Sequence, residues 1–245
     1  MNDFTFLTAE QYFGTQVLDV IQKRGTKAAP TDFAILLGGH VNNDFHYNGG
    51  TSLESRTGWH WTKTDDGDND ARVVSSHGRS RWDAVVIRDV CGRPALPFSN
   101  LSAISTNGVS GRAQDGILEV ENGYYPQTAF SKVMQGRLEN ALRVGTLIQT
   151  GNTYTTDSRE YSEYDSDFLE QRHIEYEYEG KKCVRVKANS CFDGQKFTLS
   201  NGEEYQDGDF VWIEVQPVKW LIDEKYKIML VEKLIFAGVQ FNPER

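Results

Sequence analysis

The pattern of apolar and polar positions predicts two amphipathic helices. Apolar residues recur at helical spacing through 9–24, after a capping-box sequence at 8–11 and before Gly25, which can end a helix. A second helical pattern covers 128–144 and ends at Gly145. Because each pattern has one apolar face, we expect both helices to pack against a sheet.

Short apolar or alternating runs predict the strands of that sheet. The continuous apolar run at 33–37, between Pro30 and Gly38, predicts a buried strand. Clean alternation on both sides of Gly180 predicts a β-hairpin over 173–187. Further strand-like runs lie at 211–215, 218–222 and 227–236. Polar segments expected to be irregular are 40–55, 98–115 and 146–172.

One stretch, 56–97, combines most of the chain's distinctive residues. It holds Trp59 and Trp61, an acidic run, and a polar and basic run that ends in Trp82. Short β-rich runs between these features predict three strands joined by polar loops. Residues two apart on a strand share a face, and large aromatic side chains in a strand are more often core than ligand platform. We therefore expect one or both tryptophans in the core and His60 on the opposite face, toward solvent.

Composition describes a soluble globular protein. With 245 residues, 38% of them hydrophobic, the chain can bury a core without disulfides or metals. A net charge of −9 argues against nucleic acid and anionic membranes as partners. The N-terminus lacks a signal-peptide pattern and no apolar run approaches the ~20 residues of a membrane span. We therefore expect a cytoplasmic or virion-associated protein. The cysteines lack CxxC spacing and should be reduced: Cys91, Cys183 and Cys191.

Several short motifs resemble a known family. GWHWT at 58–62, ARVV at 71–74 and GRPAL at 92–96 resemble the closing half of C-type-lectin-like domains of the formylglycine-generating-enzyme type, in particular bacterial and phage modules with this pattern. GYYPQ at 123–127 and the run at 217–241 resemble the opening half. The resemblance implies an α+β, C-type-lectin-like fold with two helices, short twisted antiparallel sheets and long loops. Since the closing half comes first, it also implies a permuted or duplicated domain.

The same resemblance divides the chain and limits its chemistry. It implies a C-type-lectin-like segment at 1–115 and a helix plus β-rich segment at 116–245, packed into one globule. Enzymes of the family use a copper-binding cysteine pair or a histidine-rich iron site, and neither pattern is present, so we expect no enzymatic activity. The Gly-Arg-Pro turn implies that Arg93 anchors loops by hydrogen bonds to carbonyl oxygens.

The best candidate for binding is the polar and basic run of the 56–97 stretch. His77, Arg79, Arg81 and Trp82 are expected in a glycine-containing turn between strands, where such a scaffold presents its contacts. Arg and Trp are also enriched in interface hot spots. His60 joins this set because we expect it at the surface. The alternative is an ordinary polar hairpin with no binding role.

The acidic run offers a candidate metal site. Asp66, Asp68 and Asp70 alternate, and such carboxylates in a turn could coordinate Ca²⁺. An EF-hand is excluded, because His77 stands where that loop needs a bidentate Glu. We favour the alternative of a solvated acidic hairpin loop, and expect no cofactor.

The sequence thus predicts non-catalytic recognition by a protein of phage or mobile-element type, as a virion component or an inhibitor of a host factor. A protein partner suits the acidic charge and the Tyr-rich segments, which include Tyr154, Tyr161, Tyr164, Tyr176 and Tyr178. One alternative is a carbohydrate-binding, lectin-like module. Another is a metal-dependent, oxidase-like enzyme of the formylglycine-generating type. Family membership alone does not decide among them, because the family hosts all three activities.

Overall fold

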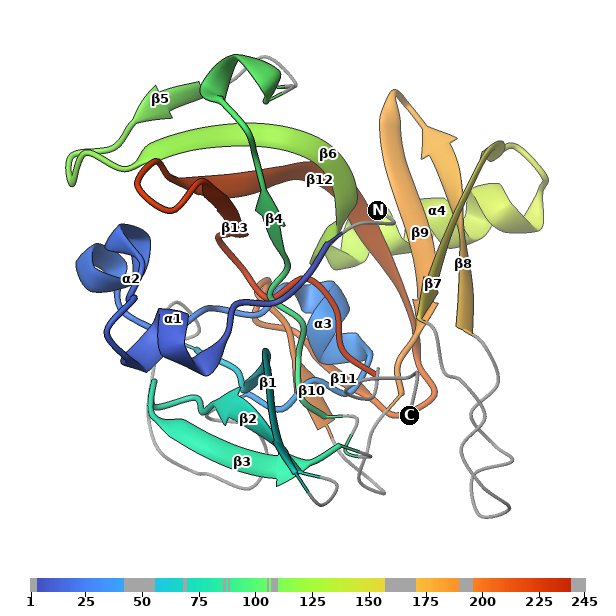
Figure 1. The fold of residues 1–245 in the computed structure, drawn as a ribbon. Coiled ribbons are helices and arrows are strands. Elements are labelled where there is room, and N and C mark those ends of the chain that lie inside the picture. Colours follow the sequence, from blue (N-terminus) through green and yellow to red (C-terminus); the bar gives the residue numbers. More distant parts are fainter. Residues whose placement is uncertain are drawn as a thin grey trace.

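The computed structural model describes residues 4–41, 56–67, 70–85, 87, 89–104, 106, 110–156, 171–189 and 196–238. These residues form four α-helices and 13 strands, an α+β structure dominated by sheet (Figure 1). The predicted α+β class is confirmed, while the C-type-lectin-like assignment stays a prediction. The helices are α1 (Ala9–Phe13), α2 (Asp19–Arg24), α3 (Asp32–Leu36) and α4 (Lys132–Arg143).

The helix predicted at 9–24 is in fact two short helices, α1 and α2. Thr8 forms the predicted capping box with Gln11, and Gly25 ends α2 as expected, with φ 80°. The break follows from Glu10, whose carboxylate accepts hydrogen bonds from the backbone N–H and the hydroxyl of Thr15, at 2.5 and 2.7 Å. These bonds hold the chain in a turn after Phe13 and end the first helix.

Helix α3 replaces the buried strand predicted at 33–37, so that prediction is wrong. The Thr31 side chain caps the helix by accepting a hydrogen bond from the Ala34 N–H, at 3.2 Å. Every residue of α3 is buried. A short apolar run fits a buried strand or a buried helix equally well, and here the N-cap decides.

The large sheet is organised around one long strand, β12 (Phe210–Asp223). One side of β12 pairs with β6 for most of its length, while its other side pairs with β9 at the start and β13 at the end. From there the sheet continues through β8 to β7, and through β13 to β4. Its remaining strands are β4 (Ala95–Pro97), β5 (Ser110–Arg112), β6 (Leu118–Ala129), β7 (Ile148–Thr156), β8 (Gln171–Tyr178), β9 (Lys181–Lys187) and β13 (Ile228–Val231).

Several strand predictions are confirmed and others need correction. The hairpin at 173–187 is confirmed as β8 and β9, joined through Glu179 and Gly180, both with positive φ. The runs at 211–215 and 218–222 form one strand instead of two. Pro217 lies between the parts of β12 that pair with β9 and β13, where a missing N–H is tolerated. The segment expected to be irregular at 146–172 begins with β7, and its residues 157–170 lie outside the described part.

Helix α4 confirms the second predicted helix, although it begins at Lys132 rather than 128. Leu138 and Ala141 are buried, and the cluster around Leu138 includes Trp212 of β12. Val133, an apolar residue of the helical pattern at 128–144, is nevertheless 71% exposed and does not belong to the buried face. None of the helices in the described ranges combines the length and apolar character that crossing a bilayer requires.

A small antiparallel sheet lies beside the large one and comes from the 56–97 stretch. It contains β1 (His60–Gly67), β2 (Asp70–Val74) and β3 (Ser80–Ala84), in that order (Figure 1). The three predicted strands are confirmed, and the third, β3, contains Arg81 and Trp82 instead of beginning after them at the apolar run 84–87. A second hairpin, β10 (Lys196–Thr198) and β11 (Glu204–Gln206), has Asn201 and Gly202 in the segment between its strands.

Main-chain pairing joins the two predicted segments, 1–115 and 116–245. Strand β4 pairs with β13, and β5 pairs with β6. In addition, the buried carboxylate of Asp32 accepts hydrogen bonds from the Ala129 N–H at 2.7 Å and from the N–H and hydroxyl of Ser200 at 2.8 and 2.6 Å. Both described cysteines, Cys91 and Cys183, are buried and reduced as expected. Cys191 lies outside the described residues.

Candidate functional site: the β2–β3 hairpin

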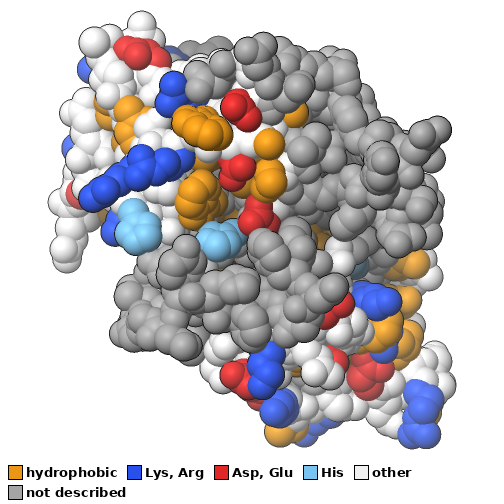
Figure 2. Space-filling model, turned by 90° about the horizontal axis from the view of Figure 1, so that it is seen from below, with side chains coloured by type: hydrophobic (Ala, Val, Ile, Leu, Met, Phe, Trp, Pro, Cys, Tyr) orange, Lys and Arg blue, Asp and Glu red, His pale blue; other side chains and the backbone are white. Residues whose placement is uncertain are grey.

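Four of the five predicted binding residues lie together on the hairpin of β2 and β3, and all four are exposed: His77, Arg79, Arg81 and Trp82. Trp82 is 62% exposed, whereas Trp61 on the neighbouring β1 is 1% exposed. Figure 2 looks onto this side of the molecule and shows apolar, basic, acidic and histidine side chains gathered close together. The hairpin therefore offers a chemically mixed surface with a large aromatic side chain.

Arg81 and Trp82 belong to strand β3 itself rather than to a loop. Trp82 lies opposite Arg72 of β2, and Arg81 lies opposite Val73. Because successive residues of a strand point to opposite faces, Arg81 and Trp82 present their side chains on different faces. Strand β3 is the outer strand of the small sheet, and within the described residues it pairs with β2 alone.

The turn between β2 and β3 holds this surface in a fixed position. Ser75 donates its N–H to the Arg79 carbonyl at 2.9 Å, and Gly78 donates its N–H to the Ser75 carbonyl at 2.8 Å. Gly78 has φ 75°, and a Cβ there would lie 2.5 Å from the Thr26 hydroxyl. That hydroxyl donates a hydrogen bond to the Gly78 carbonyl at 2.8 Å. The turn therefore requires glycine and is tied to the segment after α2.

The arginines of the hairpin are available for a partner. Among the described residues the Arg79 guanidinium forms no ion pair, and that of Arg81 reaches only the Ser80 carbonyl, at 3.4 Å. Both side chains are exposed on a chain with net charge −9. This end of the hairpin is therefore a local basic patch on an acidic protein.

Two carboxylates with raised pKa lie near the other end of β3, Asp83 on the strand and Asp89 after it, and the sequence pattern did not indicate these shifts. Burial raises the pKa of Asp83, and the negative charge of Asp70 raises it further. The pKa of Asp89 is raised to about 6, first by burial and then by the charge of Asp83. His40 Nδ1 lies 3.9 Å from Asp89 Oδ2. Near neutral pH a fraction of Asp89 is protonated, so this end carries less negative charge than its residues suggest.

His60 does not belong to the exposed surface, so the prediction that it faces solvent is wrong. It is 0% exposed, and its ring packs edge-on against Tyr12 with the centroids 5.5 Å apart. Helix α1 covers this end of the small sheet, which buries the face expected to be open. Burial, and next the charge of Arg93, hold the pKa of His60 well below its ordinary value. His60 is therefore neutral at pH 7.

Arg93 confirms its predicted structural role. Its Nε donates to the Val231 carbonyl at 3.0 Å, and its Nη2 donates to the Glu232 carbonyl at 3.5 Å. The side chain is buried, with the residue 3% exposed. Arg93 thus fastens the segment after the small sheet to the end of β13.

The predicted calcium-binding run does not lie in a single loop. Asp66 belongs to β1 and Asp70 begins β2, with Gly67 opposite Asp70. Asp68 lies outside the described residues, as does the Asp66 side chain. No group of three or more His, Cys, Asp or Glu in the described part of the chain is arranged to hold a metal ion. Calcium binding by this run stays the less favoured alternative to a solvated acidic loop.

The tyrosines expected at a contact surface are packed into the large sheet where the structure describes them. The Tyr154 hydroxyl donates to Glu175 at 2.6 Å, and the Tyr176 ring packs against Trp212 with centroids 5.8 Å apart. Tyr178 packs against the same cluster as Trp212. All three are half-buried, so only part of each side chain is open to solvent, and their role in a contact surface stays a prediction. Tyr161 and Tyr164 lie outside the described residues.

A buried polar cluster around Glu175 was missed by the sequence reasoning. The Glu175 side chain is 0% exposed and lies 3.1 Å from Lys182 Nζ. It also accepts hydrogen bonds from Thr150, Asn152 and Tyr154, at 2.5, 3.1 and 2.6 Å. Burial opposes ionisation, but these bonds together lower the pKa of Glu175. The carboxylate is fully satisfied and holds β7, β8 and β9 together.

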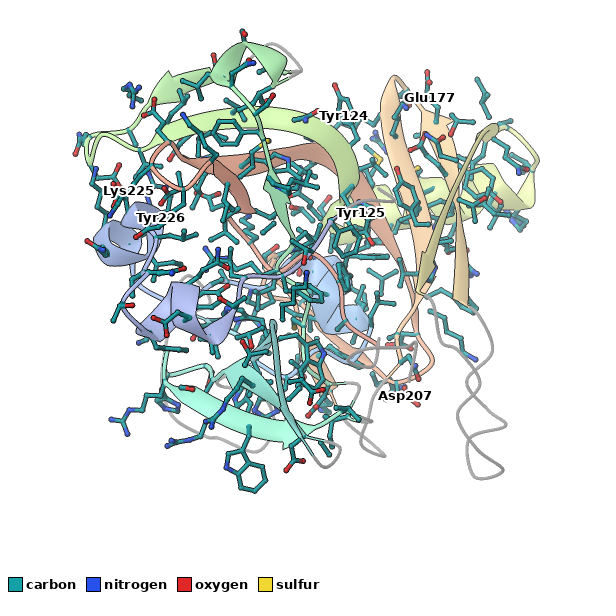
Figure 3. All side chains as sticks on the ribbon, viewed as in Figure 1. Tyr124, Tyr125, Glu177, Asp207, Lys225 and Tyr226 are labelled. Atoms are coloured by element: carbon teal, nitrogen blue, oxygen red, sulfur yellow. The ribbon has the colours of Figure 1, made fainter. Side chains whose placement is uncertain are left out.

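Adjacent tyrosines of β6 show how the large sheet separates its inner and outer sides. Tyr125 packs against the Phe33 ring of α3 and the Tyr154 ring, with both centroid distances 5.5 Å. Tyr124 is 48% exposed, and the two side chains point away from each other (Figure 3). The inner side of the large sheet is thus filled by aromatic contacts, and Tyr124 is exposed on its outer side. The β2–β3 hairpin combines an exposed tryptophan with two exposed arginines, so it is a better candidate for recognition than this part of the large sheet.

Comparison with known proteins leaves the hairpin as the basis for any functional argument. No protein-family model, no curated protein and no solved structure matches this chain.

Proposed function

We propose that this chain is a non-catalytic recognition protein that contacts a protein partner through the β2–β3 hairpin. The observation that carries the proposal is Trp82, a tryptophan 62% exposed on a strand with an ordered turn. Burying such a side chain in a complex releases a large apolar area from water. Tryptophan and arginine are also the residues most enriched where interface binding energy concentrates.

The charge of the molecule supports a protein partner over nucleic acid. Nucleic-acid affinity comes largely from many Lys and Arg contacts to phosphates. Here two exposed arginines, Arg79 and Arg81, stand on a chain with net charge −9, and carboxylates follow at the end of the same strand. A mixed surface of this kind suits electrostatic complementarity with a protein.

The motif resemblance suggests a biological setting for this proposal. GWHWT at 58–62 and GRPAL at 92–96 resemble bacterial and phage modules. We place the chain with them as a virion component or an inhibitor of a host factor. Either role works by surface contact and needs no catalytic group.

Affinity capture with matched variants tests this proposal. Immobilised wild-type protein is compared with the double variant Arg81→Ala, Trp82→Ala and with the control Val133→Ala, Ile148→Ala, which removes two exposed side chains from α4 and β7. All three proteins should unfold at nearly the same temperature, because the altered side chains are exposed. We expect a protein retained by wild type and control from a lysate of the cell that expresses the chain, and lost with the hairpin variant. Equal retention by all three would contradict the proposal.

A further inference from the structure

The outer edge of β3 has main-chain groups without partners in the described residues. The Ser75 N–H donates to the Arg79 carbonyl, so residues 75 and 79 form a hydrogen-bonded pair. Such pairs alternate along an antiparallel ladder. In this register the N–H and carbonyl groups of Arg81 point toward β2, whereas those of Ser80 and Trp82 point away from it. At Ala84 the edge no longer offers unpaired groups. The Ala84 N–H donates to the Asp83 carboxylate, and the Ala84 carbonyl accepts from the Ile87 N–H.

We propose that this edge binds an extended acidic segment of a partner protein, which adds to the small sheet as a strand beside β3. The inference rests on the proposed recognition function and names the partner's chemistry. An extended segment satisfies the outward N–H and carbonyl groups of Ser80 and Trp82 by main-chain pairing. An exposed strand edge is a ready template for such addition.

The side chains of β3 define which sequence the segment carries. Arg79 directly precedes β3 and Arg81 lies on it, so their spacing of two places them on one face of the extended chain. Neither guanidinium forms an ion pair within the described ranges. Residues directly opposite each other on neighbouring strands have Cβ atoms about 5 Å apart. Acidic residues of the segment opposite these two arginines form cross-strand ion pairs, so they stand two residues apart.

Trp82 and Asp83 of β3 determine the remaining residues expected in the bound segment. Trp82 points to the other face and is 62% exposed, so an apolar residue opposite it gains contact area. Asp83 disfavours an acidic residue opposite itself. The edge therefore selects an apolar residue followed or preceded by two acidic residues at alternate positions. Their order depends on whether the added strand is parallel or antiparallel.

Defined peptides test this inference. The probe is a labelled, blocked heptapeptide, Thr-Phe-Glu-Thr-Glu-Thr-Thr, together with its reversed sequence so that both strand directions are covered. A peptide of the same composition with adjacent glutamates, and one with Lys in place of Glu, serve as controls. Fluorescence anisotropy should show the alternating acidic peptide binding about two- to three-fold more tightly than the adjacent-Glu peptide, because adjacent glutamates can place only one carboxylate opposite an arginine and so lose one cross-strand pair.

Charge-reversal variants at the β3 edge test whether the arginines determine the peptide preference. Arg79→Glu with Arg81→Glu should invert the preference, from the Glu peptide to the Lys peptide. Arg137→Glu with Arg143→Glu makes the same charge change on the exposed side of α4 and should leave the preference intact. Ser80→Pro removes one outward N–H but no bond to β2, so it should weaken binding at an unchanged melting temperature.

The outcomes separate this inference from the proposed function. Loss of the alternating preference, or charge reversal without inversion, would overturn strand addition. Arginine-dependent binding of oligothymidylate in place of the acidic peptide would overturn it as well. If the peptides fail while hairpin-dependent capture of a partner persists, recognition stands and only the strand-addition mode is wrong. If capture fails to depend on the hairpin, the proposed function is wrong.

Discussion

Neighbouring residues of β1 show what alternation along a strand can and cannot predict. Trp61 faces the core, with 1% exposure, as the period of two indicates. The same period placed His60 on the opposite face, and there it does lie. That face is covered by α1, whose Tyr12 ring packs against the His60 ring. Alternation therefore predicts the direction in which a side chain points, but not whether another element packs against it and buries it.

The burial of His60 makes folding stability depend on pH. Its folded pKa lies well below the ordinary value of 6.5, while an unfolded chain titrates near that value. As the pH falls below about 6.5, the unfolded state binds a proton that the folded state does not, so stability falls by up to about 1.4 kcal/mol per pH unit for such a group. Burial also lowers the pKa of His173, which adds a loss of the same sign.

Replacing His60 by leucine should therefore stabilise the protein more at acidic pH than at neutral pH. Neither ring nitrogen of His60 finds a well-formed hydrogen-bond partner within the described residues, so the substitution removes no strong bond. Urea unfolding of wild type and His60→Leu at about pH 7.5 and about pH 5 measures the effect. The wild type should lose more stability than the variant on acidification, with His173 causing the remaining loss. Equal losses would show that His60 is protonated in the folded state.

At the scale of elements, the short helix α3 depends on a single carboxylate. Asp32 accepts hydrogen bonds from backbone N–H groups of Ala129 and Ser200, at 2.7 and 2.8 Å, and from the Ser200 hydroxyl. These bonds connect α3 to β6 and to the segment after β10. A five-residue helix gains little from its own hydrogen bonds, so tertiary contacts must hold it in place.

Asp32→Ala should lower the free energy of unfolding by about 2–4 kcal/mol, because it leaves buried N–H groups without an acceptor. Asp19→Ala provides a matched control, since Asp19 is also an acidic residue in the first turn of a short helix. Its side chain is 44% exposed, and its loss should cost less than about 1 kcal/mol. Urea denaturation of both variants measures the difference. Similar small losses would show that α3 is held by its apolar contacts alone.

Element types were predictable where the local pattern was unambiguous and failed where distant contacts decided. The hairpin at 173–187 has a turn with two positive-φ residues between alternating runs, and it formed as expected. The apolar run of α3 fits a buried strand as well as a helix, and its helical form depends on the Thr31 cap and on Asp32, which bonds to backbone N–H groups distant in sequence. The exposed position of Trp82 followed from the local pattern of the hairpin. By contrast, the raised pKa of Asp89 depends on burial and on Asp83, which periodicity does not reveal.

At the scale of the molecule, segments far apart in sequence share one sheet. Leu96 of the GRPAL motif lies opposite Met229, in the later run that resembles the opening half of the family. This pairing places two segments that are far apart in sequence side by side in the large sheet. The sequence indicates each motif, but strand partners more than a hundred residues apart are fixed by packing and not by local pattern.

Because β4 and β13 pair, and Arg93 links the small sheet to the end of β13, the described structure should unfold as one cooperative unit. Native-state hydrogen exchange should give similar opening free energies for the Val73 amide of β2 and the Ile213 amide of β12. Arg93→Ala removes the hydrogen bonds to Val231 and Glu232 and should lower both values together, by about 2–4 kcal/mol. A drop at Val73 with no change at Ile213 would show that the small sheet opens independently. In that case the hairpin would move relative to the large sheet, and the edge of β3 would not be a fixed template for a partner strand.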